Sequence, residues 1–424
     1  MRGPAGKAAA GRRTAGRASA APVGAAPVGA DGGSGVCAPE PGALLSPRNG
    51  AALRSCGPGL LCDGERRWPV VAGIPWLRTG REDLRRRAVR SIEAGDHEEA
   101  ALVLLADNDD WWDGPAPSRD ALRAALGAAT LHRAVTLLGM GRVGEYFLHR
   151  WSDPTWLAVL ALTARHSPGR LPVLELACGA GHLLRELLLR GHRDVTGTDV
   201  VFAKLWLARR FVAPTARLVC ADVTAPWPLR PPGRPAYVAC HDALYFLPRQ
   251  EEVVRRAVVY AGGGGVVLGH CHNALVDGPA AGFPRDPAGW RALLPGALCY
   301  DDADLTRAAL DGTPPRPRTT AALAGCEAMA LVSASPPAPG HGPRSVARPV
   351  PGRPLRLNPL YADGALRWPG KRWREEYGPG ARAYLPARVD PSPALLADAR
   401  AGRLTPQVAE LARRRVLLDL PERW

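Results

Sequence analysis

Two short apolar runs with a helical pattern between them lie near the middle of the chain. Leu171–Leu176 is a run of the kind that forms buried parallel strands. A glycine-rich turn follows, and leucines then recur at helical spacing as far as Gly191, a typical helix-terminating residue. The next run, DVTGTD, ends in Asp199 and predicts a second strand. The pattern therefore predicts a strand, a tight turn, a helix and a strand, which is the repeating unit of a parallel α/β sheet.

The turn and Asp199 together indicate a nucleotide-like ligand. A carboxylate at the end of the second strand, about twenty residues after the turn, meets ribose hydroxyls in Rossmann-like folds. The dinucleotide pattern G-x-G-x-x-G fails, because Leu184 occupies the third glycine position. The turn instead has an acidic residue followed by small residues at every second position: Glu175, Ala177, Gly179 and Gly181. We therefore expect a ligand that carries a ribose.

The Glu-x-Ala-x-Gly-x-Gly pattern resembles motif I of class I S-adenosylmethionine-dependent methyltransferases. The resemblance extends from about Val143 to Ser335 and implies a Rossmann-like, seven-stranded α/β sheet with S-adenosyl-L-methionine as the cofactor. It also implies that the acidic end of the third strand contacts adenine. For the aromatic segment before the first strand, two roles stay open: it lines the methionine end or the substrate mouth, or it packs its helix onto the sheet. The implied cofactor-binding residues are Glu175, Ala177, Gly179, Gly181, Asp199, Asp222, Val223 and Tyr146.

The predicted fourth and fifth strands, AYVACH and GGGGVVLGHCH, end in polar residues. Open α/β sheets bind ligands at the carboxyl ends of their strands. Methyl transfer requires alignment of the nucleophile and, for some acceptors, removal of a proton. The candidate catalytic residues are His241, Asp242, His270 and His272. His241 and Asp242 are the leading candidates, because the resemblance places their segment beside the reacting methyl. A structural role is the alternative for any single histidine.

The absence of several methyltransferase motifs reduces the number of acceptor classes to consider. The fourth strand does not end in the Asp/Asn-Pro-Pro-Tyr/Phe tetrad used on nucleobase amino groups, and no Pro-Cys pair suits cytosine methylation. Lys204 is the only lysine in the predicted core, so the paired-lysine tetrad of ribose enzymes cannot form. We expect a small-molecule or protein acceptor. The alternatives are an RNA methyltransferase and a non-catalytic protein that binds the cofactor or activates a partner.

The N-terminal part divides into three predicted regions. Residues 1–43 lack large apolar side chains and predict a disordered tail. Residues 44–79 predict a small β module, and its end, WPVVAGIPWL, resembles Trm112-like modules, which are zinc-ribbon-derived methyltransferase partners. A zinc ribbon needs two close cysteine pairs, yet five residues separate Cys56 from Cys62, and only the distant Cys37 precedes them. We therefore expect a degenerate module, and no metal in the chain.

The remaining regions are assigned by composition. Residues 80–142 predict a helical connector, in which Asp107, Asp109 and Asp110 form an acidic loop and Ser118 or Asp120 caps the next helix. Residues 336–354 predict a linker rich in proline, glycine and arginine. Residues 355–424 combine arginine with aromatic residues and predict an extension that packs on the core.

The charge and hydropathy of the chain indicate which partners and which cellular compartment to expect. The net charge of +15 comes almost entirely from arginine, since the chain has only three lysines, so RNA remains a possible but less favoured partner. No apolar run approaches the roughly 18 residues of a membrane span. Cysteines within apolar runs indicate buried, reduced thiols. We therefore expect a cytoplasmic protein that does not enter the membrane, and the sequence does not predict its oligomeric state.

Overall fold

The computed structural model describes residues 43–109, 112, 114–276, 281–334 and 349–424. The predicted N-terminal tail, Asp110, Cys37 and most of the predicted linker therefore lie outside the described residues.

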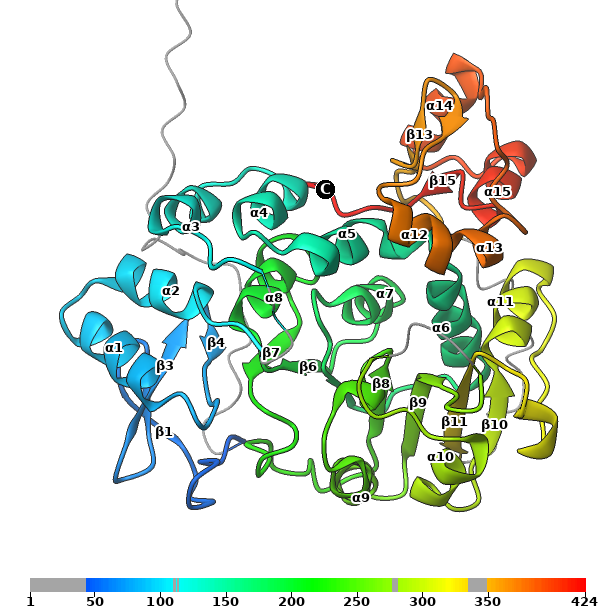
Figure 1. Cartoon of the computed structure of the whole chain (residues 1–424). Helices are drawn as coiled ribbons and strands as arrows, with labels where there is room; N and C mark the ends of the chain where they lie inside the picture. Colours follow the sequence, from blue (N-terminus) through cyan, green and yellow to red (C-terminus); the bar gives the residue numbers. More distant parts are fainter. Residues whose placement is uncertain (1–42, 110–111, 113, 277–280, 335–348) are drawn as a thin grey trace, which may run out of the picture.

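A seven-stranded sheet forms the centre of the molecule (Figure 1). The strand order is β10-β11-β9-β8-β5-β6-β7, and only β11 runs antiparallel to both of its neighbours. The strands are β5 (Val173–Leu176), β6 (Val195–Asp199), β7 (Arg217–Cys220), β8 (Tyr237–His241), β9 (Gly265–His272), β10 (Leu298–Asp301) and β11 (Ala328–Ala334). The predicted seven-stranded, Rossmann-like fold is confirmed.

The period of two along each strand separates two hydrophobic layers. Val173 of β5 packs in one core cluster, whereas Leu174 and Leu176 pack in the other. The first cluster contains buried residues of α6 (Pro154–Arg165), α7 (His182–Leu189) and α8 (Phe202–Leu207). The second contains residues of α9 (Gln250–Ala261) and α10 (Pro287–Leu293). Helices therefore cover both faces of the sheet. The ends of the strands are the positions that stay accessible to a ligand.

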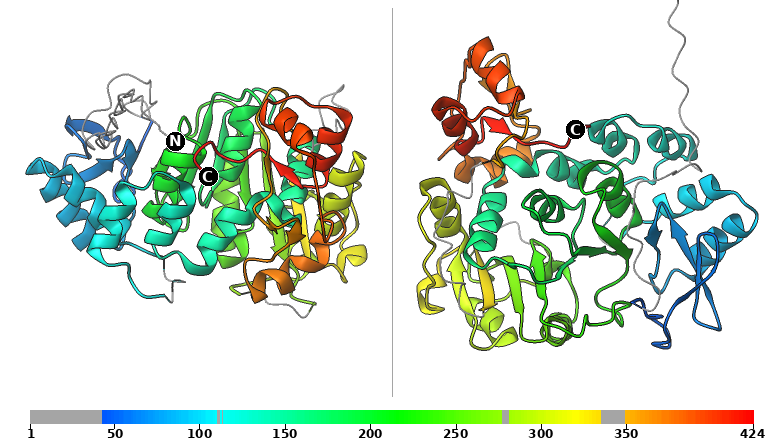
Figure 2. Two further views of the ribbon diagram at one scale, coloured as in Figure 1. Left: turned by 90° about the horizontal axis from the view of Figure 1, so that it is seen from above. Right: turned by 180° about the vertical axis from the view of Figure 1, so that it is seen from behind.

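A smaller antiparallel sheet precedes the central domain. It contains β1 (Arg54–Gly57), β2 (Leu60–Cys62), β3 (Arg67–Val71) and β4 (Ile74–Pro75) in sequence order. Trp76 forms a parallel bridge with Cys220, and the Leu77 amide donates a 2.7 Å hydrogen bond to the Cys220 carbonyl. The small sheet therefore covers the β7 edge of the central sheet, which would otherwise expose unpaired backbone groups (Figure 2).

Among the described residues, five short helices lie between the small sheet and the first helix of the central domain. They are α1 (Glu82–Glu93), α2 (His97–Leu105), α3 (Arg119–Leu126), α4 (Leu131–Leu137) and α5 (Gly141–His149). Ser118 caps α3 by accepting a hydrogen bond from the Ala121 amide, which confirms one of the two predicted caps. A 3-10 turn, η1 (Arg150–Ser152), joins α5 to α6.

The C-terminal residues form a small unit against α5, η1 and α6 (Figure 1). The Tyr384 hydroxyl donates a 2.6 Å hydrogen bond to the Ser152 carbonyl, and the Arg415 guanidinium donates to the Trp151 carbonyl. The elements are β12 (Arg356–Leu357), β13 (Tyr361–Ala362), β14 (Ala365–Leu366), α12 (Lys371–Glu376), α13 (Gly378–Ala381), α14 (Pro393–Arg400), α15 (Pro406–Arg413) and β15 (Leu417–Leu418). This unit therefore holds the helices that lead into the first strand of the central sheet.

Within the described residues, no helix is long and apolar enough to cross a membrane. All eight described cysteines are free, and six of them are buried. The buried, reduced thiols predicted from the apolar runs are thus present: Cys178, Cys220, Cys240, Cys271 and Cys326.

Candidate active site

The glycine turn after β5 is shaped by backbone conformations that favour glycine. Gly179 and Gly181 have φ angles of +54° and +81°. A Cβ atom on Gly179 would lie 3.0 Å from the Phe147 ring. The Asp199 carboxylate accepts hydrogen bonds from the Gly179 amide at 3.0 Å and from the Val201 amide at 2.9 Å. The carboxylate predicted to meet a ribose therefore also holds the turn in place.

Lys204 connects Asp199 to the helical connector. Its ammonium lies 3.1 Å from an Asp109 carboxylate oxygen and 3.8 Å from an Asp199 oxygen. Asp107, by contrast, is buried in an ion pair with Arg78 at 2.7 Å. Two of the predicted carboxylates before α3 are thus paired within the protein, and Lys204, the partner of Asp109, also lies beside Asp199.

Glu175 is a buried carboxyl with an unpaired oxygen. Its side chain points into the layer that contains α7, and its Oε2 atom has no hydrogen-bond partner among the described residues. Burial, together with the nearby Asp199 charge, raises the pKa of Glu175 to about 8 despite the opposing Arg150 charge. A buried carboxyl of this kind calls for a cationic partner.

Asp222 and Val223 come just after β7, separated from it by Ala221, whose amide donates a hydrogen bond to the Asp199 carbonyl at the end of β6. The Asp222 carboxylate accepts a hydrogen bond from the Thr224 amide at 2.8 Å and another from the Thr224 hydroxyl at 2.7 Å. The Val223 carbonyl accepts a bond from the Trp227 indole at 2.8 Å. Both residues are thereby fixed at the strand end where the sequence predicts the adenine contact.

Asp242 is the centre of a hydrogen-bonded cluster at the end of β8. Tyr146 and Tyr245 each donate a phenolic hydrogen bond of 2.8 Å to its carboxylate, one to each oxygen. The Arg150 guanidinium lies 3.5 Å away. Burial opposes the charge of Asp242, but the neighbouring His270 and Arg150 charges and the two phenols lower its pKa below the usual value. Asp242 is therefore an ionised carboxylate in a buried setting.

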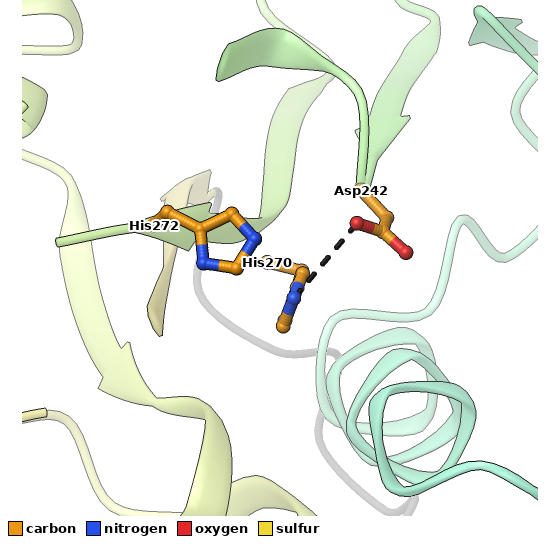
Figure 3. Close-up of side chains that lie close together, drawn as sticks. All are labelled: Asp242, His270 and His272. Carbon is orange, nitrogen blue, oxygen red and sulfur yellow. Dashed lines mark ion pairs between the residues drawn. The ribbon is translucent and has the colours of Figure 1, made fainter. Parts of the chain in front are cut away.

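His270 and His272 extend from β9 toward the same point (Figure 3). His270 Nδ1 lies 2.7 Å from a carboxylate oxygen of Asp302, and its Nε2 lies 3.8 Å from Asp242 Oδ1. Burial lowers the pKa of His270, but the two carboxylates outweigh it and raise the pKa to about 9. Burial, with the charge of His270, lowers the pKa of His272 to about 4.

His241 has a different environment from the other three candidate catalytic residues. Its ring packs over Gly269, where an added Cβ would lie 2.1 Å from Nδ1. Neither ring nitrogen has a hydrogen-bond partner among the described residues, and burial lowers the pKa of His241 to about 3.

Asp242 and His270 have left-handed backbone angles, φ +55° and +54°, which are strained for residues other than glycine. The strand ends are therefore held in unusual conformations where the candidate residues meet.

Two residues of this cluster were not predicted from the sequence. Tyr245 lies three residues after Asp242, so its position beside the strand end offered a local signal. Asp302 begins α11 (Asp302–Asp311), 32 residues after its partner His270. Its segment carries no pattern that links it to β9, because the contact depends on how β10 and β11 cross over.

Comparison with known proteins gives one family match, which covers part of the chain. Residues 173–265 match the model of a family described as a methyltransferase domain. No curated protein sequence matches the chain.

Several solved structures resemble parts of the chain. A TehB-like SAM-dependent methyltransferase from Corynebacterium glutamicum is 19% identical, with a TM-score of 0.30, over 42% of this chain and 85% of that one. Magnesium protoporphyrin IX methyltransferase from Synechocystis PCC 6803 is 16% identical, with a TM-score of 0.28, over 50% and 88%. The plantazolicin methyltransferase BpumL is 13% identical, with a TM-score of 0.26, over 35% of this chain. The match spans only 60% of BpumL.

The family match covers β5 to the start of β9, so this part of the central sheet resembles a methyltransferase domain. The residues present would fit S-adenosylmethionine, the cofactor predicted from the sequence, because Gly179 and Gly181 shape a tight turn with left-handed φ angles and Glu175 offers an unpaired buried oxygen to a cation. The cofactor supplies a methyl group on a positively charged sulfur.

Proposed function

We propose that the protein transfers a methyl group from S-adenosylmethionine to a small molecule or a protein, at the carboxyl ends of β8 and β9. The observation that supports this most is the convergence of Asp242, His270 and His272 at the strand ends (Figure 3). Asp242 follows β8, which pairs with β5, the strand that leads into the glycine turn. Two phenols and a guanidinium hold Asp242 in place. A preorganised polar cluster in a buried setting suits the alignment of an acceptor with the methyl group.

The proposed cofactor contacts follow from position and chemistry. Asp199 accepts hydrogen bonds from the ribose hydroxyls, and Glu175 balances the positive charge of the methionine part. Gly179 and Gly181 let the backbone approach the ligand, with Ala177 in the same turn. Two further groups complete the proposed set: Asp222 and Val223 contact adenine, and Tyr146 lies at the methionine end.

The proposed acceptor contacts come from the other strand ends. Asp242, His270 and His272 bind the acceptor and assist loss of its proton, and His241 supports β9 from the adjacent strand. The loop after β9 carries two exposed apolar side chains, Leu275 and Phe283, which are 61% and 51% exposed. The Phe283 amide donates a 2.6 Å hydrogen bond to the Tyr245 carbonyl, so this loop lies next to the cluster. An acceptor with an apolar body and one polar nucleophile fits this combination.

The test is methyl transfer from radiolabelled S-adenosylmethionine to separate pools of metabolites, proteins and RNA. We expect labelling of the metabolite or protein pool, and loss of it in Asp242→Asn with binding of S-adenosylhomocysteine retained. Salt-sensitive labelling of RNA alone would support the RNA alternative instead. Cofactor binding with no labelling of any pool would favour a non-catalytic role.

We also propose that residues 44–79 are a degenerate Trm112-like module that has become a permanent part of the chain. The module contacts β7, an edge strand of the central sheet, and three strands (β6, β5 and β8) lie between β7 and β9. Its role is therefore to cover a sheet edge and not to contact the acceptor.

We further propose a reducing, cytoplasmic location, which the free thiols of the described cysteines support.

A further inference from the structure

We propose that Asp242, His270 and His272 bind a divalent transition-metal ion of the first row. We call these residues the Asp-His-His triad. One carboxylate oxygen and one nitrogen from each ring lie within 4.8 Å of one another, and no other such group of three exists in the described part of the chain (Figure 3).

The distance between His270 and Asp242 fits two ligands of one ion better than a hydrogen bond. His270 Nε2 lies 3.8 Å from Asp242 Oδ1. This is longer than the roughly 2.7 to 3.2 Å of an N–H···O bond. Metal–ligand distances of about 2.0 to 2.2 Å place two ligands of one ion about 3.3 to 4.2 Å apart. The gap between the two side chains therefore matches an ion that both can reach.

The surroundings of the triad orient its ligand atoms. Asp302 Oδ2 lies 2.7 Å from His270 Nδ1, so the Nδ1 proton stays with Asp302 and the Nε2 proton is the one that an incoming ion displaces. Metal-binding histidines commonly have such a carboxylate on their other nitrogen. Tyr245 donates one hydrogen bond to Asp242 Oδ1, and a carboxylate oxygen has a second lone pair available. His270 and Asp242 are thus each held by a partner that leaves a ligand atom available.

The ligand types select the kind of ion. Two imidazoles and one carboxylate suit zinc, iron, cobalt or nickel, whereas magnesium and calcium prefer sites made of oxygen atoms alone. Three protein ligands leave coordination positions open. Resting on the proposed function, we infer that an acceptor oxygen fills one of them. Its hydroxyl proton then passes to solvent, its lone pair forms the O–CH₃ bond, and the C–S electron pair stays on sulfur as S-adenosylhomocysteine.

The test is direct binding of an ion to the full-length protein after treatment with a chelator. Calorimetry with ZnCl₂, and visible absorption with CoCl₂, should each give one ion per chain. MgCl₂ should not compete at millimolar concentration. Asp242→Asn and His272→Gln should each weaken zinc binding at least about 100-fold, and Asp302→Asn about 10- to 100-fold.

Matched controls separate the triad from other ligands. His97→Gln removes an exposed histidine, and Cys56→Ser removes a thiol of the N-terminal module, so neither should change the stoichiometry. Thermal unfolding checks that each variant folds, and titration with S-adenosylhomocysteine in the same samples tests the methyltransferase assignment separately. The proposal is overturned if wild-type protein binds no zinc, or if the triad variants bind as well as wild type. Zinc lost only in Cys56→Ser would also overturn it, since the ion would then belong to the N-terminal module.

Discussion

Asp199 has two tasks, because one carboxylate both holds the glycine turn and faces the proposed ribose position. Replacing Asp199 with alanine removes the acceptor of two backbone amides and the proposed ribose contact. We expect Asp199→Ala to weaken binding of S-adenosylhomocysteine by about 1.5 to 3 kcal/mol, or roughly 10- to 150-fold. Calorimetric titration measures this directly.

Asp194 provides the control for Asp199. It lies just before β6, where it pairs with Arg217 and Arg234 on the surface. Asp194→Ala should leave cofactor affinity nearly unchanged. Equal losses in the two variants would show that Asp199 acts only through the stability of β6.

Glu175 makes cofactor binding depend on protons. With a pKa of about 8, its carboxyl is mostly protonated at pH 7 in the free protein. A bound cation favours the ionised form, so binding of S-adenosylmethionine should release up to one proton at pH 7. Calorimetry in buffers of different ionisation enthalpy measures this release. It should be smaller in Glu175→Gln, and an equal release in that variant would rule Glu175 out as its source.

At the scale of the elements, the turn between β5 and α7 places the strictest requirement on residue type, because it needs glycine. Gly179 combines a left-handed φ with a close approach to Phe147, whereas Gly191 has a left-handed φ but open space around its Cβ position. Alanine at either position should cost about 1 to 2 kcal/mol of backbone strain. Gly179→Ala should cost more, and it alone should weaken cofactor binding. Chemical denaturation and cofactor titration of both variants test this, and equal behaviour of the two would contradict it.

The ends of β8 and β9 form the second important element pair. Parallel pairing sets His241 beside Gly269 and brings the following residues, Asp242 and His270, to the same edge. The Asp242 amide donates a 2.9 Å hydrogen bond to the Gly269 carbonyl, which continues the ladder one residue beyond β8. The positions of the candidate catalytic groups therefore depend on strand register more than on flexible loops.

At the scale of the whole molecule, the N-terminal module and the central sheet share one core. Trp76 is fully buried and lies in the same cluster as residues of α6 and α8. Trp76→Ala should cost about 3 to 5 kcal/mol and lower the melting temperature of a single transition. Val259→Ala is the control, because Val259 is 60% exposed and should change stability by less than about 0.5 kcal/mol. Two separate transitions in the wild-type protein would instead show that the module unfolds independently.

The part of the candidate site that could be predicted from the sequence consists of residues that lie close together along the chain. Glu175, Gly179 and Asp199 lie within one strand, turn, helix and strand, and the spacing of apolar residues alone indicates each of these elements. The candidate residues at the ends of β8 and β9 were likewise predictable, since parallel strands present their carboxyl ends at one edge. Local periodicity thus determined the fold class, the glycine turn proposed to bind the cofactor and the position of the polar strand ends.

Contacts between distant segments were decided only by the tertiary structure. Tyr146 reaches Asp242 across 96 residues of sequence, and Asp302 reaches His270 because β11 enters the sheet between β9 and β10. No pattern within either segment specifies its partner, since a hydrogen bond or a metal ligand set needs only suitable atoms at the right distance. The sequence alone therefore indicated which residues have suitable chemistry, and the packing of helices and crossovers decided which of them meet.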